Sequence, residues 1–248
     1  ACDGLLPERF AVIGFSKEDY TAETLRDRLS AGIREFTTRS GVDPAVWDKL
    51  VARFDYLQGD FADPEAYQTL AARVAATDAT AGTGGNVLFY FAVPPPLFAV
   101  IAGRLAAAGL NRGAGWRRLI VEKPFGKDSK SAAELNRKLL ADWREDQIYR
   151  IDHYLGKETV QNLLVFRFAN GVFEPLWNKA HVDHIQFTVS ETVGVEGRGG
   201  YYDHAGVLRD MIENHMFQML AYLCMEPPAS FRPDAIRNEK AKLLDAVR

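Results

Sequence analysis

The densest group of reactive side chains in this sequence lies at residues 152–158 (DHYLGKE). This segment stands where a series of alternating strands and helices ends and a further helix begins. The N-terminus of a helix attracts anions, because its first N–H groups have no partner within the helix and the macrodipole is positive there. His153, Tyr154 and Lys157 add hydrogen-bond donors at the same place. The segment predicts a phosphate-binding site, and a solvated loop with incidental charge is the alternative.

A second group, at residues 209–215 (RDMIENH), lies in a predicted helix that is otherwise apolar. His215 has the side chain of a general base that works near neutral pH, and a histidine packed in the core is the alternative. Asp210 precedes His215 by five residues, which is about 140° around an ideal α-helix. Asp210 is therefore a poor partner for orienting His215, and we expect a carboxylate from elsewhere in the chain.

A third group, at residues 121–126 (VEKPFG), follows a predicted strand. A lysine in the position of Lys123 can contact both a cofactor and a substrate oxygen, and Pro124 is compatible with a cis peptide bond. An ordinary strand-to-helix loop is the alternative. His181 and His184 lie three residues apart in a predicted strand and so face opposite sides, and we predict no metal site.

Composition places the chain among soluble globular proteins, with 47% hydrophobic and 25% charged residues in 248. The net charge of −3 argues against an electrostatic nucleic-acid binder. The least charged stretch, residues 82–103, contains three consecutive prolines, so we expect no membrane-spanning helix. The first residues lack the pattern of a signal peptide. Cys2 and Cys224 form no metal or disulfide pattern, which favours a reducing compartment, the cytoplasm.

Strands and helices alternate in the first part of the chain, which is typical of an α/β fold with a mostly parallel sheet. Strands are predicted at residues 9–15, 54–57, 86–93, 119–122 and 147–151. Helices are predicted at residues 21–37, 43–54, 63–76, 97–110 and 129–140. Asp-Pro pairs at 43–44 and 63–64 mark two helix starts. The continuous apolar run at 86–93 predicts a strand covered on both faces.

The pattern changes after Asp152 and indicates the start of an α+β layer. Here the sequence predicts a helix at 157–169, a long strand at 181–191, a glycine-rich loop at 194–200 and helices at 205–223 and 238–248. We therefore expect two domains, at residues 1–151 and 152–248.

Five segments together resemble the glucose-6-phosphate dehydrogenase family, in the family's order and spacing. They are RIDHYLGKE at 150–158, VEKPFG at 121–126, VQNLLVFRFAN at 160–170, EGRGGYYD at 196–203 and RDMIENH at 209–215. The resemblance implies a Rossmann-like NADP-binding domain, followed by the start of an α+β domain with an antiparallel sheet. It also implies an internal fragment, because nothing before Ala1 corresponds to the family's first strand and GxxGDLA loop, and the family's second domain continues beyond Arg248.

The resemblance implies a reaction, the first step of the oxidative pentose phosphate pathway. Glucose 6-phosphate is oxidised at C1 to 6-phospho-D-glucono-1,5-lactone, with hydride transfer to NADP. By resemblance, His215 is the base and Asp152 pairs with it. The other implied substrate contacts are His153, Tyr154 and Lys157 to the 6-phosphate, Glu191 and Asp210 to sugar hydroxyls, and Lys123 to both sugar and coenzyme. The whole protein is expected to form a homodimer or homotetramer.

The coenzyme preference has some support from the residues themselves. A site that prefers NAD usually has an acidic residue at the end of its second strand, whereas the strand at 9–15 is followed by Ser16 and Lys17. A hydroxyl and an ammonium fit a 2′-phosphate, so NADP is predicted. Lysine lacks the bidentate fork of the arginine common in the family, which leaves NAD open. Tyr90 and Lys123 are further coenzyme contacts by resemblance.

Two alternatives are also consistent with the sequence. The chain could be another EKP-type sugar oxidoreductase, which has no need of a phosphate site, so His153 and Lys157 distinguish it. It could also be a catalytically inactive fragment of the dehydrogenase.

Overall fold

The computed structural model describes residues 5–37, 41–190 and 194–247. The chain divides into two compact units. The first comprises Ala1–Val121 and Asp128–Arg150, and the second comprises Glu122–Lys127 and Ile151–Arg248. The loop that carries Lys123 thus belongs to the same unit as residues 152–158 and 209–215.

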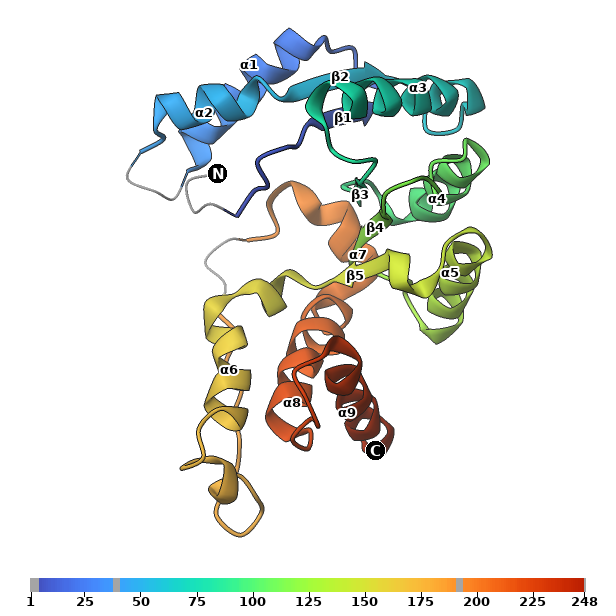
Figure 1. Cartoon of the computed structure of the whole chain (residues 1–248). Coiled ribbons are helices and arrows are strands. Elements are labelled where there is room, and N and C mark those ends of the chain that lie inside the picture. Colours follow the sequence, from blue (N-terminus) through green and yellow to red (C-terminus); the bar gives the residue numbers. More distant parts are fainter. Residues whose placement is uncertain (1–4, 38–40, 191–193, 248) are drawn as a thin grey trace. The chain divides into compact units, whose positions relative to one another are not determined.

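The first unit contains two small sheets (Figure 1). Strand β1 (Val12–Ser16) pairs in parallel with β2 (Phe54–Gln58), with Val12 opposite Phe54. Strand β3 (Val87–Phe91) pairs in parallel with β4 (Arg117–Glu122), and β5 (Ile148–Ile151) lies on the other side of β4. The predicted α/β fold is confirmed. The expected sheet, however, is in two parts, and no strand in the described residues joins β1 to β3.

The described α-helices of the first unit are α1 (Ala22–Phe36), α2 (Pro44–Val51), α3 (Pro64–Ala81), α4 (Phe98–Ala107) and α5 (Ser129–Asp142). They begin, with the exception of α4, at residues whose side chains cap them. Asp43 accepts hydrogen bonds from the N–H groups of Ala45 and Val46, and Asp63 accepts one from Glu65. Each aspartate satisfies donors that the first helical turn leaves free, so the predicted starts of α2 and α3 are confirmed.

The core of the first unit lies between the β3–β4–β5 sheet and helices α3, α4 and α5. Its most deeply buried side chains are Tyr67, Phe98, Leu105, Leu119, Val121 and Leu139. The indole N–H of Trp143 donates to the carbonyl of Ala102 and so ties α4 to the end of α5. Leu88 and Tyr90 of β3, in contrast, are 49% and 54% exposed. Residues two apart in a strand share one face, so the prediction of a strand covered on both faces is wrong, because one face of β3 is half exposed.

Two glycines let the chain segments before β3 and β4 approach closely. A β-carbon on Gly115 would lie 2.6 Å from the backbone nitrogen of Asn86 and still closer to the carbonyl group of Gly85. Gly85 itself has a φ of +71°, in the left-handed region that favours glycine. These two residues permit the register in which Val87 lies opposite Arg117.

The second unit is helical in its described part. It contains α6 (Glu158–Phe168), α7 (Gly199–Val207), a π-helix at Leu208–Met216, α8 (Phe217–Cys224) and α9 (Pro233–Ala246). Val160, Tyr222 and Met225 form its core, with Ile236 of α9 packed against them. The buried guanidinium of Arg167 donates to the carbonyls of Tyr222 and Met225, which ties α6 to the end of α8.

Three predictions for the second unit are wrong. No strand forms in the described residues 181–190, because no described segment pairs with them, and the end of the predicted strand at Glu191 lies outside the described residues. The predicted helix at 205–223 begins at Gly199 instead, is interrupted at Gly206, and continues as a π-helix. The last helix begins at Pro233 rather than at 238, because proline is compatible with the first turn.

Candidate active site

The candidate site is centred on His215, which is completely buried. Its Nδ1 lies 2.5 Å from Oδ1 of Asp152, and its Nε2 lies 2.6 Å from Nζ of Lys123. Because the carboxylate accepts a hydrogen bond, Nδ1 is the protonated nitrogen. Nε2 then holds a lone pair and accepts from the ammonium group. The imidazole is thus held in the tautomer that can take up a proton at Nε2.

Aromatic side chains fix the plane of this imidazole. The ring of Tyr154 stacks on it with centroids 3.9 Å apart and planes 15° apart, and the ring of His153 meets its edge at 4.8 Å. On Tyr154, Nζ of Lys157 lies 3.7 Å from the ring centroid. The expected base and three expected phosphate-binding residues therefore form one contiguous cluster.

Asp210 joins this cluster through Lys123. Nζ of Lys123 lies 2.8 Å from Oδ1 of Asp210 and 3.2 Å from its backbone oxygen. The α-helical geometry expected for residues 209–215 is wrong, because the segment is a π-helix with hydrogen bonds to the fifth residue along. That wider turn brings residues five apart onto one side, so one ammonium contacts both Asp210 and His215.

Burial and charge tune the basicity of His215. Burial lowers the pKa of its imidazole below the usual 6.5, and the positive charge of Lys123 lowers it further, while the carboxylate of Asp152 acts in the opposite direction. The net direction is downward. His215 is therefore neutral at pH 7, which is the protonation state a proton acceptor needs.

The start of α6 supplies the anion-attracting part of the site. A single 3₁₀ turn, His153–Gly156, precedes the helix, and Asp152 closes it by accepting from the N–H of Tyr154 at 3.0 Å. No side chain caps α6 itself. The exposed side chains of His153 and Lys157 stand at this helix terminus, where partial positive charge already favours an anion.

The expected coenzyme residues other than Lys123 lie in the first unit. The hydroxyl of Ser16 is within 2.8 Å of the hydroxyl of Tyr56 and accepts from the N–H of Glu18, so it is already used within the protein. Lys17 is exposed at the carboxyl end of β1, and Tyr90 is on β3. Glu191, the other expected sugar contact, lies outside the described residues.

These residues fit only one end of a dinucleotide. Lys17 presents an ammonium at the carboxyl end of β1, and such folds contact the ribose of a dinucleotide at a strand end. A pyrophosphate needs a glycine-rich turn that leads into a helix N-terminus. The connections that follow β1, β2, β3 and β4 contain at most one glycine each, so none of them in the described chain offers that turn.

Lys240 is a neighbour of the site that the sequence did not reveal. On α9, its Nζ lies 2.8 Å from Oε1 of Gln218 and 4.0 Å from the ring centroid of Tyr222. Burial lowers the pKa of Lys240 to about 8, while the nearby charge of Asp152 acts in the opposite direction. The segment NEKAKLLD looks like an ordinary charged helix, so no local pattern marks this lysine.

One group of potential metal ligands coincides with the site. Ligand atoms of Asp152, His153 and His215 lie within 4.8 Å of one another. Both nitrogens of His215 already have partners, and one of these is the ammonium of Lys123, which would repel a cation. The donor set therefore suits proton transfer better than metal binding. Among the described helices, none is sufficiently long and apolar to cross a lipid bilayer.

Comparisons with known proteins point to a single family. Residues 1–162 match the model of the glucose-6-phosphate dehydrogenase NAD binding domain, and residues 164–248 match that of the glucose-6-phosphate dehydrogenase C-terminal domain. The chain is 45% identical over 247 residues to glucose-6-phosphate 1-dehydrogenase 2 of Mycobacterium tuberculosis (strain ATCC 25618 / H37Rv), covering 99% of this chain and 48% of the relative. It is 43% identical over 246 residues to glucose-6-phosphate 1-dehydrogenase of Bacillus subtilis (strain 168), covering 99% and 49%. The chain thus spans about half the length of the curated relatives it matches.

Solved structures agree with these matches. A glucose-6-phosphate dehydrogenase in complex with its substrate glucose-6-phosphate superposes with a TM-score of 0.89 at 37% identity, covering 98% of this chain and 50% of that one. The glucose-6-phosphate 1-dehydrogenase from Mycobacterium avium superposes with a TM-score of 0.81 at 39% identity, covering 95% and 50%. The alternative of a different EKP-type oxidoreductase is thereby overturned, and the chain belongs to the glucose-6-phosphate dehydrogenase family.

Proposed function

We propose that this chain carries the sugar-phosphate-binding and proton-accepting centre of a glucose-6-phosphate dehydrogenase. The protein would oxidise glucose 6-phosphate at C1 to 6-phospho-D-glucono-1,5-lactone. The observation that carries the proposal is the buried, neutral His215, whose Nδ1 is bonded to Asp152 and whose Nε2 is directed at Lys123. The anion-attracting start of α6 lies in the same cluster, as a phosphorylated sugar requires.

In this proposal, Nε2 of His215 takes the proton from the C1 hydroxyl. The imidazolium that forms is stabilised by the carboxylate of Asp152, which is already at hydrogen-bonding distance. The sugar hydroxyl takes over the position at Nε2 that the ammonium of Lys123 holds, and Asp210 retains that ammonium nearby. A bound nicotinamide coenzyme supplies the acceptor for the hydride that leaves C1.

The remaining substrate contacts follow from the same cluster. His153, Tyr154 and Lys157 bind the 6-phosphate at the N-terminus of α6, where charge-assisted hydrogen bonds are strongest. Asp210, together with Glu191, accepts hydrogen bonds from sugar hydroxyls.

The finer features of the proposal rest on fewer residues. NADP is the proposed coenzyme, because Ser16 and Lys17 follow β1 where an NAD site has an acid, and Tyr90 and Lys123 are further proposed contacts. A cytoplasmic location is proposed from the absence of a disulfide pattern. A homodimer or homotetramer is proposed for the whole protein from its family.

Sugar binding tests the phosphate-binding part directly on the 248-residue chain. Lys157→Ala should weaken binding of glucose 6-phosphate by roughly 10–150-fold, because a charge-assisted contact contributes about 1.5–3 kcal/mol. Binding of unphosphorylated glucose should be unchanged within about twofold, since no phosphate is lost. Isothermal titration of both sugars measures this. Lys179→Ala, which removes an exposed lysine elsewhere in the second unit, is the matched control, and equal losses for both sugars would contradict the proposed role.

Catalysis is tested in a hybrid in which this chain replaces the matching segment of the Bacillus subtilis relative. The hybrid should reduce NADP in the presence of glucose 6-phosphate. His215→Asn should lower kcat by roughly 10²–10⁴-fold with a smaller change in KM, because a positioned base contributes on that scale. Absorbance at the NADPH band measures turnover. His184→Asn, at an exposed histidine bonded to Asp183, is the control, and near-normal kcat in His215→Asn removes this residue from the mechanism.

A further inference from the structure

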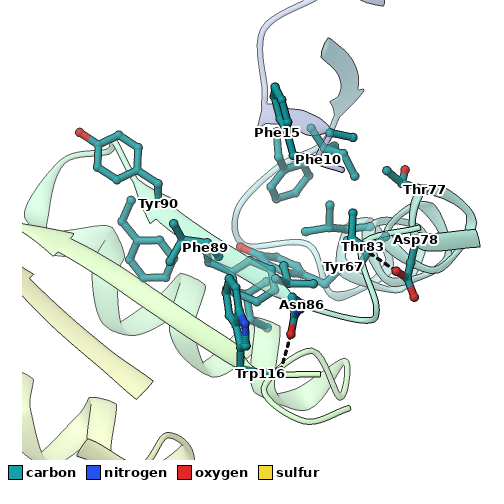
Figure 2. Close-up of a pocket in the computed structure, with 18 of the residues that line it drawn as sticks. Phe10, Phe15, Tyr67, Thr77, Asp78, Thr83, Asn86, Phe89, Tyr90 and Trp116 are labelled. Atoms are coloured by element: carbon teal, nitrogen blue, oxygen red, sulfur yellow. Dashed lines mark hydrogen bonds between the residues drawn. The ribbon is translucent and has the colours of Figure 1, made fainter. Parts of the chain in front are cut away.

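The pocket of the first unit is mostly apolar, and its carboxylate is already used within the protein. The pocket has a volume of about 620 Å³ and is lined by residues of both β1 and β3. The carboxylate belongs to Asp78, which accepts from the hydroxyl of Thr83 at 2.5 Å and from the N–H of Gly85 at 2.9 Å (Figure 2). The second unit, in contrast, contains a partly buried ammonium group that the proposed mechanism leaves unused, on Lys240.

Lys240 extends from α9 and is held on α8. Its Nζ lies 2.8 Å from Oε1 of Gln218 and 4.0 Å from the ring centroid of Tyr222. An amide oxygen and an aromatic face both stabilise an ammonium without carrying a charge of their own. The phenol of Tyr222 stays neutral as well, because burial raises its pKa. The contacts on α8 therefore fix the position of the ammonium and leave its charge unbalanced.

The packing of the second unit brings this ammonium close to the turn that carries Asp152. Ile236, one helical turn before Lys240 on α9, packs against the core cluster of the unit, and so does Leu155 of that turn. The carboxylate of Asp152 is near enough for its charge to favour the protonated form of Lys240. Burial and the like charge of Arg237 act in the opposite direction and lower the pKa of Lys240 to about 8.

Asp152 is the carboxylate that gains from this neighbour. Its side chain is 13% exposed, and its ion-pair partner in the described part of the chain is His215, which is neutral at pH 7. Its hydrogen bonds in that part of the chain, from Nδ1 of His215 and the N–H of Tyr154, both go to Oδ1. A carboxylate in such surroundings needs a cation nearby to stay ionised.

We propose that Lys240 is a positioning residue, which balances the charge of Asp152 and so keeps this carboxylate as the acceptor for Nδ1 of His215. The inference rests on the proposed function, in which Asp152 stabilises the imidazolium that forms as C1 is oxidised. Lys240 acts through Asp152 and not on the sugar. It therefore affects the rate of proton uptake rather than the binding of glucose 6-phosphate.

NMR titration of Lys240 in the 248-residue chain measures the coupling of the two charges. Its ammonium should titrate at about 8. Asp152→Asn, which retains an oxygen to close the turn, should lower this pKa by roughly 0.5 unit or more, because a negative neighbour is removed. Asp183→Asn, at a side chain that is 98% exposed, is the control. It should change the pKa by less than about 0.2 unit, since solvent screens an exposed charge.

Catalysis in the hybrid with the Bacillus subtilis relative tests the consequence for the reaction. Lys240→Met removes the charge and keeps an unbranched side chain. It should lower kcat roughly tenfold or more and leave KM for glucose 6-phosphate within about twofold, because the substrate contacts are intact. Lys240→Arg keeps the charge and should restore kcat to within about threefold. Lys130→Met makes the same change at an exposed lysine of α5 and should leave kcat unaltered.

The pH profile separates the charge of Lys240 from its packing. The ammonium loses its proton as the pH rises through about 8, so kcat of the unaltered hybrid should fall above that pH. Lys240→Arg stays charged at every pH of interest and should not show this decrease. Lys240→Met has no charge to lose, so its low kcat should also lack the decrease.

Three results would overturn the proposal. They are a normal kcat in Lys240→Met, an equal loss of kcat in Lys240→Arg, and a pKa of Lys240 that Asp152→Asn leaves unchanged. An unaltered hybrid without activity contradicts the proposed function instead, and the NMR titration, which needs no turnover, still decides whether Lys240 and Asp152 are coupled. If Lys240→Met does not fold, this titration and the pH profile of Lys240→Arg decide.

Discussion

The ammonium of Lys123 contacts the proton-accepting nitrogen of His215. Its Nζ lies 2.6 Å from Nε2 and 2.8 Å from Oδ1 of Asp210. In the proposed mechanism, the sugar hydroxyl takes over the first of these contacts, and the second would keep the lysine beside the reacting oxygen. The residues around the imidazole thus have opposite effects on its charge, since Asp152 favours the protonated form and Lys123 the neutral form.

These opposite effects make a prediction about the pKa of His215. In the unaltered chain it should lie below 6.5. Lys123→Met should raise it, because a positive neighbour is removed, and Asp152→Asn should lower it further, because a negative neighbour is removed. NMR titration of the ¹⁵N-labelled imidazole measures all three values. Shifts in the same direction for both variants would contradict the assignment of these charges.

The same lowered pKa affects stability. Between the folded pKa and 6.5, the unfolded chain binds more protons at this histidine than the folded chain does. The contribution of His215 to the free energy of unfolding is therefore fully present above pH 6.5, and it decreases as the pH falls through 6.5 toward the pKa of the folded chain.

At the scale of elements, the π-helix determines which residues of the RDMIENH segment act together. An α-helix would separate Asp210 from His215 by about 140°. Hydrogen bonds to the fifth residue bring them to one side instead, and Lys123 from the β4 connection contacts both. Secondary-structure type therefore decides the composition of the site here, and not only its position.

The chain segments that precede β3 and β4 lie close to each other, and this contact gives a prediction at the scale of elements. Gly115→Ala should lower the free energy of unfolding by roughly 1–3 kcal/mol, because its β-carbon would overlap the backbone of Gly85 and Asn86. Gly32→Ala is the matched control. It adds the same atom in α1, where nothing lies within 4 Å, and should raise the stability by about 0.5–1 kcal/mol. Urea denaturation measures both, and equal stability of the two variants would show that the approach is not strained.

At the scale of the whole molecule, the proposed sugar site and the proposed coenzyme site differ in how many of the groups they need are present. The described residues proposed to bind glucose 6-phosphate form one cluster in the second unit, and Glu191 lies outside the described residues. The described strand-to-helix connections, in contrast, have no glycine-rich turn for a pyrophosphate.

We therefore predict that the 248-residue chain binds glucose 6-phosphate but does not measurably reduce NADP by itself. A titration with the sugar and an absorbance assay of NADPH, carried out on the same preparation, separate the two steps. The hybrid with the Bacillus subtilis relative serves as the positive control. Turnover by the isolated chain would show that these residues suffice for coenzyme binding and would correct the interpretation of its first unit.

The sequence by itself determined the family, the local elements and the types of the reactive groups. Asp43–Pro44 and Asp63–Pro64 located two helix starts, because a cap depends on residues within one turn. The segments DHYLGKE and RDMIENH indicated a phosphate site and a base, because those functions depend on the side chains present. The expected pairing of Asp152 with His215 came from the family resemblance rather than from spacing.

Tertiary structure alone decided the rest, because strands, ion pairs and buried charges depend on partners far away in the chain. Residues 181–190 have the composition of a strand but no described partner, so they form none. Leu88 and Tyr90 belong to an apolar run yet remain half exposed at the edge of β3. The contacts of Lys123 with Asp210 and His215 span 87 and 92 residues, and only folding brings their charges to the distances at which they shift a pKa.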